Sequence, residues 1–171
     1  MYKIITLFLL FSFMSYSADL HVELKTKKSF TFDKKHANDV IEAMKKLKAK
    51  KMLNLPRPKE IHAELILTNN SNKNIDINIG GDNSYLIIKL EGDGAITTNS
   101  GMMMTMDFRM GKNLTIKPGA KHVIPVPSLA HGKRGFTTYS YWTKPGVYEL
   151  AVSYKSGNKV YSSKALKVKV E

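Results

Sequence analysis

The sequence predicts a mainly β protein, an antiparallel sandwich of two sheets with one inserted amphipathic helix near the N-terminus. Beyond residue 60, short runs of apolar residues alternate with polar ones, which is the pattern of half-buried strands. Clusters of Gly, Pro, Asn and Ser separate these runs at the spacing expected for about seven to nine short strands. One segment before residue 60 instead has apolar residues at helical spacing.

Residues 1–18 predict a cleaved export signal. Met1-Tyr2-Lys3 is a positively charged start, IITLFLLFSF at 4–13 is an apolar core, and small residues precede the polar Asp19. A spanning helix needs roughly 20 apolar residues, and no later segment is as apolar, so no stable membrane span is expected. The chain has no Cys that could carry a lipid anchor. We therefore expect a secreted or periplasmic protein whose residues 19–171 fold as a single domain.

The helix is expected over about 34–53, after short strands at 20–24 and 30–32. Asp39-x-x-Glu42 resembles a capping box, and the run Leu55-Pro56-Arg57-Pro58 should end the helix. Lysines fill much of its remaining surface, so it can either pack on the core with a solvated outer face or lie on an anionic membrane surface. Its apolar face would consist of Val40, Ile41, Met44 and Leu47.

The strands that follow are marked by alternation and by turn residues. Pro125 and Pro127 cannot donate backbone hydrogen bonds, which confines their strand to a sheet edge. Tyr148 follows the turn at Pro145-Gly146 and is the type of residue that forms a buried corner, with its hydroxyl on the backbone. The predicted strands lie at about 61–68, 74–79, 86–90, 114–116, 124–126, 136–142, 148–154 and 166–170.

Three motifs stand out after residue 60: GGDNS-x-L at 80–86 leading to L-x-G-x-GA at 90–95, I-x-PG at 116–119 with IP at 124–125, and YSYWTKPGVY-x-L at 139–150. They resemble those of an uncharacterised family of exported bacterial proteins with an immunoglobulin-like β-sandwich. The resemblance covers residues from about 61 to the C-terminus and implies the fold and the export, but no activity and no catalytic residue. A helical insertion before the sandwich also fits, whereas a Met cluster departs from the expected loop.

The chain is strongly basic, with 27 Lys and Arg against 14 Asp and Glu, a formal net charge of +13. Such a charge attracts anionic partners over long range. Base readout and bidentate phosphate contacts favour arginine, yet the arginines are only Arg57, Arg109 and Arg134. No nucleic-acid partner is therefore expected, and an unknown protein, a glycan or an anionic envelope component remains open.

Two groups of side chains are candidate binding sites. Aromatic faces can stack on sugar rings, and a platform would use Tyr139, Tyr141, Trp142 and Tyr148; alternation, however, places Tyr139 and Tyr141 on one face and Trp142 on the other. Thioether sulfur is a soft ligand for copper(I), so a Met run with His122 or His131 nearby could handle this metal, unless the Met residues only fill the core. That run is Met102, Met103, Met104, Met106 and Met110.

The sequence has no recognisable catalytic signature. The five His show no metal-binding spacing, no G-x-S-x-G occurs, and the scattered acidic residues identify no carboxylate pair. Asp82 and Asp93 lie near glycines but lack the dense ligand loop that calcium requires. We therefore expect no cofactor, no metal and no enzyme activity. The function predicted is an exported non-catalytic binding or interaction module, with a periplasmic copper(I)-handling protein that uses Met102–Met110 as the alternative.

Overall fold

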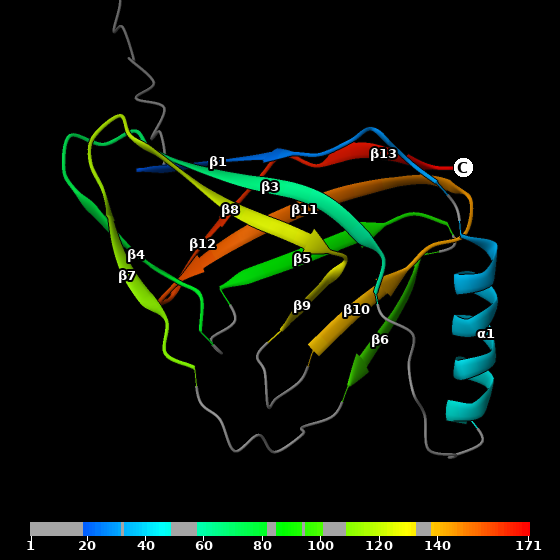
Figure 1. Cartoon of the computed structure of the whole chain (residues 1–171). Helices are drawn as coiled ribbons and strands as arrows, with labels where there is room; N and C mark the ends of the chain where they lie inside the picture. Colours follow the sequence, from blue (N-terminus) through cyan, green and yellow to red (C-terminus); the bar gives the residue numbers. More distant parts are fainter. Residues whose placement is uncertain are drawn as a thin grey trace, which may run out of the picture.

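The structure is a computed structural model, and it describes residues 19–31, 33–48, 58–81, 85–93, 95–100, 109–132 and 138–171. It is mainly β with several antiparallel sheets, as predicted, and the residues it describes form one helix, α1 (Lys34–Lys48) (Figure 1). The described residues form thirteen strands, more than expected, because several are very short. They are β1 (Leu20–Lys25), β2 (Ser29–Phe30), β3 (Glu60–Asn69), β4 (Ile75–Ile79), β5 (Leu86–Glu91), β6 (Ile96–Ser100), β7 (Lys112–Ile116), β8 (Lys121–Ser128), β9 (Ala130–Gly132), β10 (Thr138–Trp142), β11 (Gly146–Ser156), β12 (Lys159–Ser162) and β13 (Leu166–Val170).

The first sheet has the order β1-β3-β8, and both of its pairings are antiparallel. Alternation predicts β3 well, since Ile61 and Leu65 are buried and Glu64 is exposed; Ile66 breaks the pattern because it is buried on the opposite face. A bulge interrupts the β3–β8 ladder between Glu60 and Ala63. Among the described strands β8 pairs only with β3, so Pro125 lies on a sheet edge as predicted.

The second sheet is organised around the long strand β11. One edge of β11 pairs with β5, and the other pairs in succession with β13 and β12. The two-residue strand β2 adds to β13 at Lys169 and Val170, and this pairing is parallel. An entirely antiparallel sheet was expected. The exception arises because the chain leaves β1 in the first sheet and continues past Lys28 onto the edge of the second.

Two smaller sheets flank these layers. Strands β4 and β7 form an antiparallel pair, and β6-β10-β9 form a three-stranded sheet. Tyr154 ties the first of these to β11, since its hydroxyl donates to the carbonyl of Asn78 at 3.0 Å and accepts from the Asn78 N–H at 3.0 Å. In Figure 1 the pair β4 and β7 lies to the left of the larger sheets, and β6, β9 and β10 lie below them.

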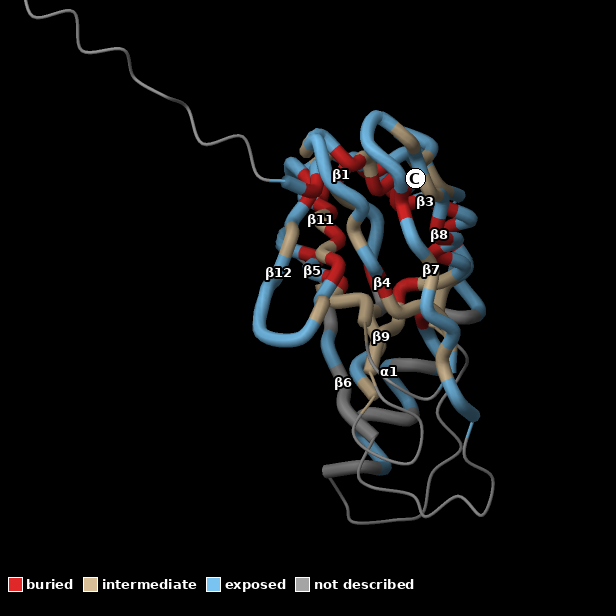
Figure 2. Tube along the Cα trace, turned by 90° about the vertical axis from the view of Figure 1, so that its left-hand side faces the viewer, coloured by how far each residue is buried: buried red, intermediate tan, exposed pale blue. Residues whose placement is uncertain are grey.

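A single apolar cluster joins the two larger sheets. It contains Leu65 and Leu67 of β3 together with Val152 and Tyr154 of β11, and all four are fully buried. Figure 2 shows the buried residues in red through the region of β1, β3, β5, β8 and β11. Tyr148 forms the predicted corner, because its side chain is buried and its hydroxyl donates to the carbonyl of Lys144 at 2.8 Å.

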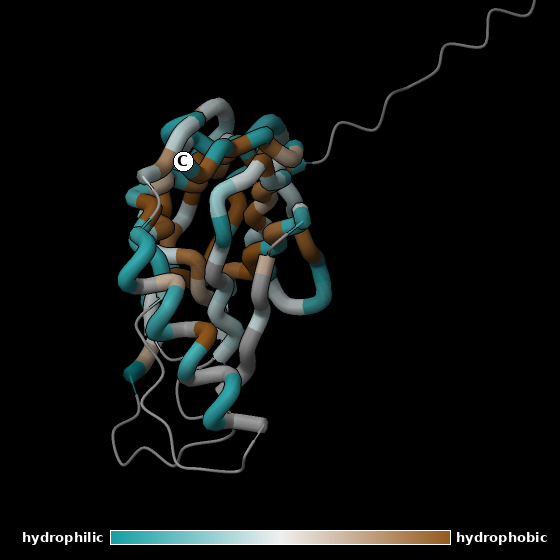
Figure 3. Tube along the Cα trace, turned by 90° about the vertical axis from the view of Figure 1, so that its right-hand side faces the viewer, coloured by the Kyte–Doolittle hydropathy of each residue, from teal (hydrophilic) through white to brown (hydrophobic). Residues whose placement is uncertain are grey.

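Helix α1 lies within the range predicted, but it begins earlier than its proposed cap. The capping box at Asp39 and Glu42 is wrong, since the helix starts at Lys34 and these residues lie in its interior. Glu42 pairs instead with Lys46 at 2.6 Å, one turn further on. Ile41, expected on the apolar face, is 36% exposed. Hydrophilic residues, in teal, recur along α1 in Figure 3, and no helix among the described residues is long and apolar enough to cross a membrane.

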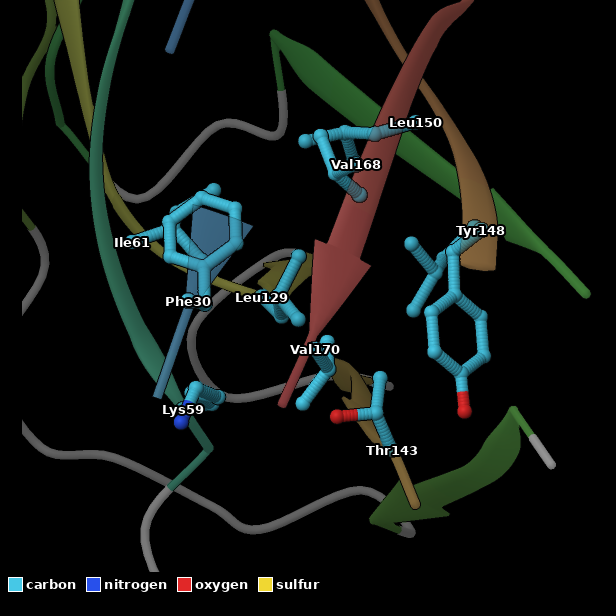
Figure 4. A pocket seen from close by; sticks show the side chains of 10 residues that line it. Phe30, Lys59, Ile61, Leu129, Thr143, Tyr148, Leu150, Val168 and Val170 are labelled. Atoms are coloured by element: carbon cyan, nitrogen blue, oxygen red, sulfur yellow. The ribbon is translucent and has the colours of Figure 1, made fainter. Parts of the chain in front are cut away.

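The end of the core beneath β2 contains a small hollow of about 10 Å³. Figure 4 shows side chains of both large sheets around it, among them Ile61 of β3, Val168 of β13 and Tyr148 of β11. A volume of this size holds at most about one water molecule. The hollow therefore belongs to the packing between the layers.

Candidate functional site

The described residues bring one partly exposed aromatic cluster together, on the sheet β6-β10-β9. Its members are His131 of β9 and Tyr139 and Tyr141 of β10. The ladder places Tyr139 directly opposite His131, and side chains two positions apart on a strand point to the same face. All three rings therefore share one side of this sheet.

The rings lie nearly parallel. The centroid of the His131 ring is 5.2 Å from that of Tyr139, with 20° between the planes, and 6.0 Å from that of Tyr141, with 23°. Tyr139 is 40% exposed. A partly exposed aromatic ring, stacked on a second ring, is thus held on backbone that is hydrogen-bonded on both sides of β10.

Backbone and side-chain bonds fix this cluster to the core. The N–H of Tyr141 donates to the carbonyl of Leu129, and the N–H of Leu129 donates to the carbonyl of Lys59, both at 2.8 Å. The Tyr141 hydroxyl donates to the Ile88 carbonyl at 2.9 Å. Ile88 lies opposite Val152 in the β5–β11 ladder, but the N–H and C=O of Val152 both bond to Ser163 on the other side of β11. Ile88 and Val152 are therefore a non-hydrogen-bonded pair, so the Ile88 carbonyl points away from β11 and can accept from Tyr141. Burial, and secondarily the neighbouring Tyr139, raises the pKa of Tyr141.

His131 is the unusual member of the cluster. Burial lowers the pKa of its imidazole below the ordinary value of 6.5, because removal from water disfavours the charged ring. Its Nδ1 atom is buried and has no hydrogen-bond partner within the described part of the chain. The ring is therefore neutral at pH 7 and serves as an aromatic surface beneath Tyr139.

The structure tests part of the predicted aromatic platform. Tyr139 and Tyr141 share a face as expected, whereas Tyr148 is buried in the core and cannot join a surface platform. The side chain of Trp142 lies outside the described residues. His131 was not expected here, because a three-residue strand carries no periodic signal and only the pairing of β9 with β10 brings it to the tyrosines.

The metal candidates fall largely outside the described residues. This applies to Met102, Met103, Met104 and Met106 and to Asp82. Met110 is 82% exposed. Asp93 is exposed in the turn after β5, and the described residues contain no group of three or more His, Cys, Asp or Glu side chains that could hold an ion.

The two histidines proposed as copper ligands lie on different sheets. His122 is on β8 opposite Leu67 of β3, whereas His131 is on the sheet that contains β6. Strand β6 ends at Ser100, which pairs with Thr138, and Thr138 in turn pairs with Gly132. Strand β6, which precedes the Met run in the chain, therefore ends at the same level of the sheet as Gly132, the residue after His131.

Compared with known proteins, the chain matches no protein-family model and no curated protein sequence.

Proposed function

We propose that the protein is an exported, non-catalytic binding module built on an immunoglobulin-like β-sandwich with α1 as an insertion. The strand order supports the fold. The sheet β1-β3-β8 corresponds to strands A, B and E of such a domain, and β5-β11-β13 corresponds to strands C, F and G. The buried Tyr148, bonded to the backbone at the start of β11, resembles the tyrosine corner of strand F.

Export rests on the sequence of residues 1–18, with its basic start and its apolar core. In that proposal residues 19–171 form one domain that is secreted or remains in the periplasm. Stability without cysteines then comes from the core and from buried hydrogen bonds such as that of Tyr154.

The stacked pair of Tyr139 and His131 carries the binding proposal. An aromatic ring that is 40% exposed, on a strand paired on both edges, is fixed before any ligand arrives, and this rigidity reduces the entropy lost on binding. Stacking on either a sugar ring or an apolar side chain would use the same surface. A protein, a glycan or an anionic envelope component is the proposed partner class.

The test compares two surface variants in the capture of envelope components. Tyr139→Ala removes the exposed ring, and Val147→Ala, at an exposed position of β11, is the matched control. We expect Tyr139→Ala to lose most of a salt-resistant captured component that wild type and Val147→Ala both retain. Capture that disappears at about 0.5 M salt for all three proteins would reflect only the positive charge, and equal salt-resistant capture by all three would exclude the aromatic surface.

The alternative proposal is periplasmic copper(I) handling by the Met102–Met110 run. It is favoured by the position of His131, whose sheet contains the strand that leads into this run. Copper(I) titrated under reducing conditions should then raise the thermal midpoint, because a ligand of the native state stabilises it. His131→Phe should weaken that effect and His122→Phe should not. An unchanged midpoint at micromolar copper(I) would eliminate this alternative.

A further inference from the structure

A second surface lies where the chain crosses from the first large sheet, after β1, to the second, at β13. It is separate from the aromatic cluster of His131, Tyr139 and Tyr141. After β1 the segment Thr26–Lys28 leaves β3, and the chain then joins β13 as β2. A groove of about 580 Å³ opens along this crossover, which is within the range of ligand sites in proteins. Its lining is Leu24, Lys25, Thr26, Lys27, Lys28, Leu166, Lys167 and Val168.

Within the described part of the chain, the edge of β13 that faces β2 is unpaired at Lys167. The N–H of Lys169 donates to the carbonyl of Lys28 at 2.8 Å, and peptide groups two residues apart on a strand point to the same side. The N–H and C=O of Lys167 therefore point toward the groove. Strand β2 pairs only with Lys169 and Val170. Lys167 therefore has no partner strand on this edge within the described part of the chain.

A buried hydroxyl group in the same lining also lacks a partner. The Oγ1 atom of Thr26 is shielded from solvent and forms no hydrogen bond within the described ranges of the chain. A buried hydroxyl without a hydrogen-bond partner is unfavourable, because it has lost its bonds to water and gained none in return. Two groups on opposite sides of the groove therefore lack a partner among the described residues: the Thr26 hydroxyl on one side and the backbone N–H and C=O of Lys167 on the other.

The groove has an apolar floor and a basic rim. Leu24 and Val168 are buried toward the core, and four lysines line the same opening. Glu149 lies opposite Lys167 in the β11–β13 ladder and offsets part of the charge at that position, while no acidic residue is among the lining residues. A second copy of the chain, with its own net charge of +13, is disfavoured as occupant.

We propose that this groove binds an extended acidic segment of a partner protein, which adds to β13 at Lys167 as a further strand. Alternate side chains of an added strand point to opposite sides. One set would contact the floor at Leu24, Leu166 and Val168, and the other would carry carboxylates toward the lysines. The ligand class is therefore a peptide in which apolar and acidic residues alternate.

The probe is a fluorescein-labelled eight-residue peptide of alternating valine and glutamate, and its control is the block isomer with four valines followed by four glutamates. Fluorescence anisotropy with the purified protein should show about tenfold tighter binding of the alternating peptide. Amide hydrogen exchange should show new protection of the Lys167 N–H when this peptide is bound. Lys167→Pro removes that outward donor, and Lys167→Gln removes only the charge.

We expect Lys167→Pro to weaken binding of the alternating peptide about tenfold and Lys167→Gln about threefold or less. Thermal unfolding verifies that both variants are folded, and wild-type protein with the two peptides tests the proposal if they are not. Equal binding of the two peptides, no binding at about 1 mM, or no new protection at Lys167 would overturn the proposal. Protection of Lys167 by dextran sulfate, or by dimerisation of the protein alone, would assign the groove to another occupant and overturn it as well.

Discussion

At the scale of single residues, the burial of His131 links the aromatic cluster to the pH dependence of folding. The folded protein disfavours protonation of this ring, since burial lowers its pKa, whereas in the unfolded chain the ring takes up a proton near its ordinary value of 6.5. The unfolded state therefore binds more protons as the pH falls below about 6.5, and the native state loses stability.

This predicts that acidification destabilises the wild-type protein more than a variant without the titrating ring. His131→Phe keeps an aromatic surface beneath Tyr139, and its thermal midpoint should fall less between pH 7.5 and pH 5 than that of wild type. His21→Gln, at an exposed position of β1, should behave like wild type. Equal losses in wild type and His131→Phe would contradict the assigned role of burial.

Asn69 is a buried polar residue whose hydrogen bonds connect two turns. Its Nδ2 group donates to the carbonyls of Lys73 at 2.7 Å and of Ile116 at 2.8 Å, and its Oδ1 accepts from the N–H and the hydroxyl of Ser71 at 2.9 and 2.8 Å. The turn after β3 and the end of β7 are thus held by one side chain, which is fully buried.

Asn69→Ala should lower the free energy of unfolding by about 2–4 kcal/mol, because it removes the buried hydrogen bond to the Ile116 carbonyl together with the bonds to Lys73 and Ser71. Asn69→Asp should also destabilise the protein, since a carboxylate cannot donate to those carbonyls. Asn70→Ala, at the exposed neighbouring position, should change stability by less than about 0.5 kcal/mol. Urea unfolding measures all three; a loss in Asn69→Ala no larger than that of the control would refute this role.

At the scale of elements, β12 and β13 act as one edge that is interrupted at 163–165. Both pair with the same side of β11, and Ser163 bridges the gap between them. Its N–H donates to the Val152 carbonyl at 3.0 Å, and its hydroxyl accepts from the Val152 N–H at 3.1 Å. A side-chain oxygen therefore takes the place of a backbone carbonyl in the ladder.

Ser163→Ala should cost about 1–3 kcal/mol, because the Val152 N–H is then buried without an acceptor. Ser162→Ala is the matched control: its hydroxyl bonds to that of Ser153 at 2.8 Å in an exposed position, and the expected change is below about 0.5 kcal/mol. Chemical denaturation of the two variants decides this, and equal effects would contradict the bridging role.

The elements differ in how far the sequence could predict them. Alternation identified β3 and β11, and the missing donor of Pro125 identified the edge at β8, because these signals are local. Strand β6, the three-residue strand β9 and the parallel pairing of β2 could not be predicted, since each depends on which distant strand it joins. The capping box at Asp39 was wrong because a capping-box spacing also occurs inside helices, where Glu42 pairs with Lys46 instead.

At the scale of the whole molecule, the candidate sites also combine features that local sequence signals predict with features that depend on long-range strand pairing. The shared face of Tyr139 and Tyr141 and the buried corner at Tyr148 follow from sequence spacing. The stacking on His131 and the groove beside Lys167 depend on long-range pairing, which a single sequence does not reveal. The aromatic cluster is bonded to Leu129 and to Ile88 of β5, and the groove lies between β1 and β13. Both proposals therefore depend on the proposed packing of the two larger sheets as opposite layers.

The packing of the two layers is tested most directly by nuclear Overhauser effects in the purified protein. We predict cross-layer effects between the methyl groups of Ile61 on β3 and those of Leu150 on β11 and Val168 on β13, because all three residues line the same small hollow. Effects between backbone Hα atoms should link β3 with β1 and β8, and β11 with β5 and β13. Backbone effects that pair β3 directly with β11 in one sheet, without the methyl contacts, would contradict the account.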